Sequence, residues 1–97
     1  MNIKKIIYSI LVEIKKGENV PSATDYGLNH GQFADIAKII KDEKYADNVA
    51  IAAPGENAIV WLDNAKITMK GIEYIEQNNI LAKTYKGLKE IRDWLKP

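Results

Sequence analysis

The segment VAIAAPGENAIVWL, residues 49–62, decides how the rest of this chain is interpreted. Short apolar runs lie on both sides of PGEN (54–57), which is rich in turn-forming residues. This pattern predicts a β-hairpin. A hairpin that follows two helices is typical of the wing of a winged helix, a fold that often binds DNA. This hairpin contains no lysine or arginine, so it is a poor clamp for phosphates whatever else it contacts.

The residues before the hairpin predict a helix-turn-helix. Residues 22–26 begin with a capping pattern and form a short helix that Gly27 ends. Asn29 then caps a longer helix over residues 30–43, with Gln32 at the reciprocal capping position. Apolar residues at helical spacing define the buried stripe of the longer helix: Phe33, Ile36, Ala37 and Ile40.

The two ends of the chain predict further helices. Residues 2–16 form an amphipathic helix that has Tyr8 and Val12 on the side opposite its main stripe, so we expect something to cover both sides. The connector after it contains Asn19-Val20, which is able to pair as a short strand. Thr68 caps a helix after the hairpin, and a last amphipathic helix spans roughly residues 81–96.

These elements predict an α+β, mainly α fold with one domain over residues 1–97. The expected order is helix, strand, helix, helix, strand, wing, strand and helix, followed by the C-terminal amphipathic helix. This is a winged helix-turn-helix with an extension. A chain of 97 residues is long enough to bury a single core.

Composition argues against several functions. The chain has no cysteine and one histidine, His30, so no metal site or nucleophilic grouping is visible. The carboxylates are scattered singly, and the glycines match no phosphate-binding loop. We therefore expect no enzyme, no cofactor and no small-molecule substrate. Residues 1–16 lack the features of a signal peptide, and no run is long enough to span a membrane, so we expect a cytoplasmic protein without a membrane partner.

Four segments carry a resemblance to a known family: YSILVEI, PSATDYGLNHGQF, ITMKGIEYIEQN and TYKGLKEIRDWLK. Over nearly its whole length the chain resembles the YjcQ-like proteins of Gram-positive bacteria and their phages. The resemblance implies a winged-helix fold and a bacterial or prophage setting. It implies no activity and no functional residues.

The first functional hypothesis is a DNA-binding regulator or accessory protein that acts as a dimer. The helix over residues 30–43 would face the duplex. The residues expected near DNA are Gln32, Lys38, Lys41, Lys4 and Lys5. The charge distribution weakens this hypothesis, because residues 17–65 carry three lysines against eight acidic residues, a net charge of −5.

The second hypothesis is a protein-interaction module that uses the winged helix only as a scaffold. The residues expected at its interface are Tyr8, Val12, Tyr85, Leu88, Ile91, Trp94 and Leu95. These apolar residues pack the C-terminal helix on the first helix within one chain, or form the seam of a homodimer, and both can hold together. The hairpin also has two interpretations. In the favoured one it completes the core and buries Trp61; in the other, residues 54–57 face a protein.

Overall fold

The computed structural model describes residues 2–53 and 55–96. These residues form a mainly helical α+β domain, which confirms the predicted class. The α-helices are α1 (Ile3–Lys16), α2 (His30–Asp42), α3 (Met69–Gln77) and α4 (Ile91–Leu95). The strands are β1 (Ala46–Asp47), β2 (Ala50–Ala52), β3 (Ile59–Trp61) and β4 (Lys66–Ile67). Short 3-10 turns are η1 (Ala23–Tyr26), η2 (Gly55–Asn57), η3 (Asn79–Lys83) and η4 (Leu88–Glu90).

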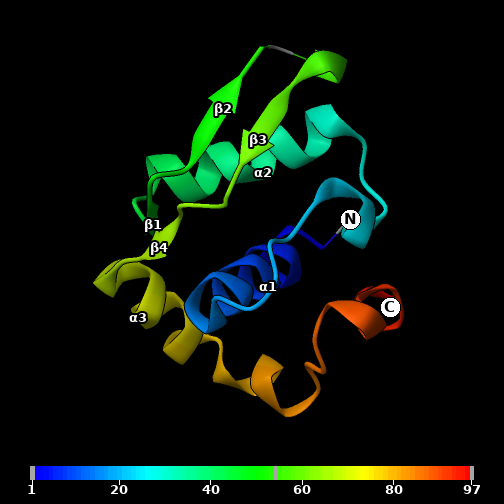
Figure 1. The fold of residues 1–97 in the computed structure, drawn as a ribbon. Helices are drawn as coiled ribbons and strands as arrows, with labels where there is room; N and C mark the ends of the chain where they lie inside the picture. The colour runs from blue at the N-terminus through cyan, green and yellow to red at the C-terminus, as the bar shows by residue number, and fades with distance from the viewer. Residues whose placement is uncertain (1, 54, 97) are drawn as a thin grey trace.

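Helix α1 lies at the centre of the molecule, with α2 and the hairpin β2–β3 on one side and α3 with the residues that follow it on the other (Figure 1). Its inner face and that of α2 supply most of the core, including Ile6, Ile10, Leu11, Ile36 and Ile40, each no more than 1% exposed. These apolar positions recur at helical spacing, which is why the helices were predictable from the sequence.

The helices begin where polar side chains satisfy the free backbone N–H groups of their first turns. At α2, the backbone N–H of Gln32 donates to the Asn29 side chain (2.8 Å), and the Gln32 side-chain oxygen accepts from the Asn29 backbone (3.0 Å). This confirms the predicted capping box. At α3, the Thr68 hydroxyl accepts from the Gly71 N–H (3.1 Å) and donates to the Lys44 carbonyl (2.6 Å). The same threonine therefore caps α3 and holds it against the end of α2.

The strands form two antiparallel pairs, β1 with β4 and β2 with β3. The predicted strand at Asn19-Val20 is wrong, because both residues are irregular and no strand pairs with them. Val20 is instead 56% exposed. Of the predicted turn over residues 54–57, Gly55–Asn57 is a 3-10 turn, and Pro54 lies outside the described residues.

The predicted continuous helix over residues 81–96 is also wrong. The segment is broken into η3, an extended stretch, η4 and the five-residue helix α4. The break falls at Gly87, whose φ of 103° is outside the helical range. We call residues 79–95 the C-terminal strap. Its extended part brings Tyr85 onto α1, and α4 places Ile91 in the core, 1% exposed.

A buried chain of hydrogen bonds fastens the strap to α1. The Tyr85 hydroxyl donates to the Glu13 carboxylate (2.6 Å) and also lies 2.8 Å from the Ser9 hydroxyl. Ser9 in turn lies 2.9 Å from the Tyr26 hydroxyl in η1. Ser9 and Glu13 are one helical turn apart on α1 and are both buried, at 0% and 2% exposure. The network therefore joins three segments that are distant in sequence.

The direction of every bond in this chain follows from counting protons. Because Tyr85 uses its only hydroxyl proton on Glu13, Ser9 must donate to Tyr85. Ser9 then has no proton left, so Tyr26 must donate to Ser9. Tyr26 therefore donates to Ser9, Ser9 donates to Tyr85, and Tyr85 donates to Glu13. Burial raises the pKa of the Tyr26 and Tyr85 hydroxyls above the usual value, which keeps these donors protonated.

Aromatic side chains cover the second face of α1 beside this network. Tyr8 is 2% exposed and meets Tyr85 edge-on, with ring centroids 5.9 Å apart. Trp94 packs against both rings, and its indole N–H donates to the Thr84 hydroxyl (2.8 Å). The side of α1 that the sequence left without a partner is thus covered from within the same chain.

We expect Tyr85→Phe to lower the free energy of unfolding by about 1–3 kcal/mol, because it removes the donor to a carboxylate that is buried. Chemical denaturation measures the change. Tyr74→Phe is the matched control: its hydroxyl donates to the Lys4 carbonyl (3.2 Å) at an exposed site, where water replaces it, so the expected loss is about 0.5 kcal/mol. Equal losses in the two variants would contradict a structural role for the network.

Candidate interaction surface

The hairpin β2–β3 presents an apolar face to solvent. Its inward residues, Ile51 and Val60, pack against the core. Since side chains alternate along a strand, their neighbours point outward. The outward set consists only of apolar residues, paired across the strands as Ala50 with Trp61 and Ala52 with Ile59.

Trp61 is 44% exposed and Ile59 is 50% exposed. The expectation that Trp61 is a buried core residue is therefore wrong. The alternation of the strand explains the error: Val60 takes the inward position, so Trp61 must face out. The described hairpin residues contain no cation, and their charged residues from Asp47 to Trp61 are Asp47 and Glu56.

The outer face of α2 carries the residues predicted to read DNA. Gln32 is exposed, but its side-chain oxygen is engaged in the capping box. Lys38 donates to Asp42 at 2.8 Å, an exposed ion pair one helical turn apart. This bond raises the pKa of the Lys38 ammonium. Lys41 is exposed in the last turn. Of the two lysines on this face, Lys38 is therefore already paired with Asp42, and Lys41 is exposed.

The tip of the hairpin packs on the first turn of α2. A Cβ added to Gly31 would lie 3.3 Å from the Gly55 carbonyl oxygen in η2, and Ala34 is only 8% exposed. In helix-turn-helix proteins, the first residues of the recognition helix contact base edges. Here part of that turn faces the hairpin of the same chain.

Lys4 and Lys5, also predicted near DNA, differ: Lys4 is exposed and contacts α3 through its backbone, whereas the side chain of Lys5 packs on α4. The Lys4 carbonyl accepts from Tyr74 in α3. The Lys5 ammonium donates to the Trp94 carbonyl (2.9 Å) and lies 5.0 Å from the centre of the Trp94 ring. Lys5 thus holds α4 in place, and no hydrogen bond among the described residues links either lysine to α2.

The predicted protein-interface residues gather where the strap meets α1. Tyr8 and Ile91 are buried within the chain, at 2% and 1% exposure. The others are half-buried: Val12, Tyr85, Leu88, Trp94 and Leu95. This is the packing within one chain that the sequence offered as one of two alternatives. Burial raises the pKa of the Tyr8 hydroxyl in this cluster. Burial likewise raises the pKa of the nearby Tyr74 hydroxyl on α3 to about 12.

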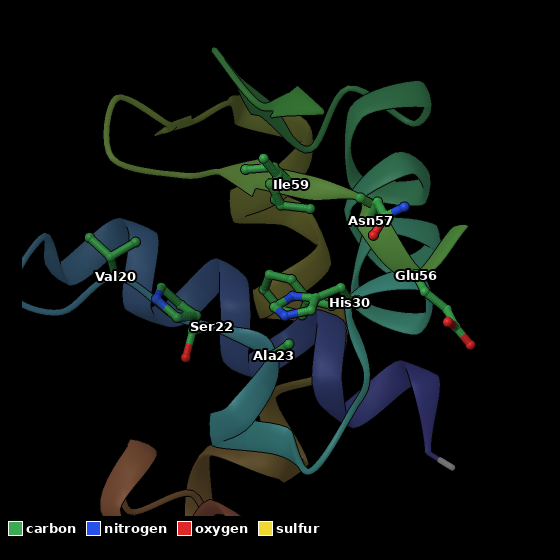
Figure 2. Close-up of a pocket in the computed structure, with 11 residues that line it drawn as sticks. Val20, Ser22, Ala23, His30, Glu56, Asn57 and Ile59 are labelled. Carbon is green, nitrogen blue, oxygen red and sulfur yellow. The ribbon is translucent and has the colours of Figure 1, made fainter. Parts of the chain in front are cut away.

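A cleft of about 450 Å³ lies between the hairpin and the connector that follows α1. The connector wall contains Val20 and Ser22, and the hairpin wall contains residues 56–60. Phe33 and His30, at the start of α2, also line the cleft. In Figure 2, Val20 lies at one end of the cleft and Glu56 at the other, with His30 and Ile59 between them.

The described residues contain neither a cluster of metal ligands nor a helix suited to crossing a membrane. Within residues 2–53 and 55–96, no group of three or more histidine, cysteine, aspartate and glutamate side chains is arranged to hold a metal ion. Over the same ranges, no helix has both the length and the apolar character needed to cross a membrane.

Comparison with known proteins gives the family. The family model described as "YjcQ protein" matches residues 8–94. The chain belongs to the YjcQ family. It is 33% identical over 96 residues to the "Uncharacterized protein YjcQ" of Bacillus subtilis (strain 168), covering 99% of this chain and 100% of that protein. This confirms the resemblance noted in the sequence. No solved structure matches the chain significantly.

The apolar hairpin face and the hydrogen-bond network of Ser9 and Glu13 were not predicted from the sequence. A signal for each was present. For the hairpin, the signal was that every residue of both strands is apolar, so whichever row faces outward is apolar; which row that is required the register, Ala50 with Trp61 and Ala52 with Ile59. Ser9 and Glu13 lie beside Tyr8 and Val12 on the face of α1 that needed a cover, which marked them as buried polar residues.

We expect the double variant Ile59→Thr/Trp61→Thr to change the free energy of unfolding by less than about 1 kcal/mol, because both side chains are largely outside the core and threonine is a good strand former. Val60→Thr on the same strand is the control. It points inward, so a hydroxyl there should cost about 1–3 kcal/mol. A large loss in the outward variant would show that the hairpin face is structural.

Proposed function

We propose that this protein is a protein-interaction module built on a winged-helix scaffold. The order of elements supports the scaffold: a first helix, a short helical turn, a longer helix and then a hairpin whose tip lies against that longer helix. The observation that carries the function is the outward face of the hairpin, with Ile59 and Trp61 half exposed and no lysine or arginine among the described hairpin residues. The 33% identical relative from Bacillus subtilis supports a bacterial setting, and we propose the cytoplasm as the compartment.

The proposed partner is a second protein whose surface combines apolar and basic side chains. Exposed aromatic residues on a firm scaffold are typical centres of protein interfaces. The charge around the hairpin is acidic, since residues 17–65 have a net charge of −5. A basic rim on the partner would complement this charge and accelerate the encounter.

Incorporation of the photo-cross-linker benzoylphenylalanine in place of Trp61, in cells of the source organism, tests the proposal. We expect one dominant cross-linked protein. The same cross-linker in place of Ile80, which is 71% exposed on the strap, should not capture it. The purified partner should then bind the Ile59→Thr/Trp61→Thr variant at least tenfold more weakly by calorimetry, because truncated aromatic anchors typically cost 2 kcal/mol or more.

Three results would reject the proposal: no cross-linked product, equal capture from both positions, or a partner that binds the double variant as tightly as the native chain. Capture of a second copy of this chain would replace the proposed partner by a homodimer. Sedimentation of the purified protein would identify that case independently.

Binding to duplex DNA is the second candidate, and one observation favours it. Lys38 and Lys41 lie on the exposed side of α2, in the position of a recognition helix. Against it stand the ion pair of Lys38 with Asp42, the packed first turn of α2 and the acidic hairpin. Each acid near a duplex repels the phosphates that a DNA-binding protein must neutralise.

We expect no saturable binding to a labelled mixed-sequence duplex, measured by fluorescence anisotropy at about 50 mM salt and up to about 100 μM protein. DNA binding becomes the better proposal if affinity is measurable at about 50 mM, collapses at about 200 mM, and is lost in the variant Lys38→Glu/Lys41→Glu. The variant Lys83→Glu/Lys86→Glu makes the same charge change on the strap and serves as the control.

A further inference from the structure

Strand β3 has a free edge. It pairs with β2 on one side only, in a sheet of two strands. Outside that ladder, no hydrogen bond of the described chain involves the backbone of residues 59–61. In an antiparallel strand, alternate residues direct N–H and C=O groups toward each edge. The outer edge of β3 therefore presents backbone donors and acceptors that are available to another strand.

The free edge borders the cleft described above. Residues 56–60 line one wall, and the connector residue Val20 lines the opposite wall. The connector was predicted to supply a strand beside the hairpin, but it stays irregular and leaves Val20 56% exposed. The space that such a strand would fill is the cleft itself, about 450 Å³. Figure 2 shows the connector and β3 on its two sides.

The lining of the cleft defines the chemistry of an occupant. Val20, Phe33 and Ile59 are apolar, and Glu56 lies at the rim at the end away from Val20, with its carboxylate directed outward in Figure 2. Neither lysine nor arginine lines the cleft. An extended peptide alternates its side chains, so it would direct apolar residues into the cleft and could place a lysine or arginine beside Glu56.

We infer that a short extended segment of the partner, in which apolar residues alternate with lysine or arginine, binds in this cleft as a third strand on the outer edge of β3. This inference rests on the proposed protein-interaction function and specifies how the partner is held. The edge of β3 is three residues long, about 10 Å at strand spacing, so the segment that pairs is also about three residues long.

Selection of a phage-displayed library of random seven-residue peptides on the immobilised full-length protein tests the inference. We expect enriched sequences that alternate apolar residues with lysine or arginine. A synthetic peptide of the enriched sequence should shift the NMR amide signals of residues 19–23 and 57–61. Two peptides are compared, each N-methylated on one of the two alternate sets of backbone amides. Only the set that faces β3 should abolish binding, because main-chain hydrogen bonds hold the peptide on that strand.

Val20→Lys is the decisive variant, because it places a cation in the cleft at an exposed position outside the core. We expect it to weaken the peptide at least tenfold. Ile80→Lys makes the same change at an exposed residue of the strap and should leave affinity unchanged. Glu56→Gln should weaken the peptide less, and more at low salt than at high salt.

The inference is overturned if no sequence is enriched, if the shifted amides lie on α2 or the strap, or if Val20→Lys binds as well as the native chain. The proposed function fails separately. A partner that cross-links at position 61 but tolerates Val20→Lys supports the interaction module without strand addition. Peptide binding in the cleft without any cross-linked partner supports the cleft alone.

Discussion

The hydrogen bond from Tyr85 to Glu13 is the contact on which the C-terminal half of the molecule depends. A carboxylate that is 2% exposed is costly unless it is bonded, and Tyr85 is its hydrogen-bond donor within the described chain. To donate this hydrogen bond, Tyr85 must reach Glu13 on α1. A continuous helix over residues 81–96 would have to place Tyr85 at that same position. The chain instead breaks at Gly87 and resumes helical structure only at Leu88. The irregular path of the strap thus combines a positive φ at Gly87 with the contact that Tyr85 makes to a buried acid.

Closing the strap on α1 determines where apolar surface remains. Tyr8, which would otherwise be a large exposed side chain, is enclosed by Tyr85 and Trp94. Of the large apolar residues that stay exposed, Val20, Ile59 and Trp61 belong to the cleft or the hairpin face. A surface that gathers several such residues is a better candidate for binding than the strap, where Ile80 is exposed by itself and Tyr85, Ile91 and Trp94 pack on α1.

The parts of the fold that follow from local chemistry were predictable from the sequence. Helical periodicity defined α1 and α2, and the side chains of Asn29 and Thr68 marked where α2 and α3 begin. The parts that depend on distant partners were not. Asn19-Val20 has strand character but pairs with nothing, and the amphipathic pattern of 81–96 gave no sign that Tyr85 leaves the helix to reach Glu13. For the hairpin surface, the sequence already showed that residues 49–62 contain no lysine or arginine. The outward position of Trp61 became clear only from the register of β2 and β3.

The same hairpin supports the proposed protein partner over a duplex. A duplex presents a dense row of phosphates, and a wing contributes to binding when it carries cations that neutralise them. Here the hairpin keeps its inward side chains, Ile51 and Val60, for the core and presents apolar ones outward, while its tip lies on the first turn of α2. The hairpin leaves unpaired backbone groups along one edge and exposed apolar side chains on one face. Another polypeptide can pair with the first and cover the second, whereas a phosphate backbone can do neither.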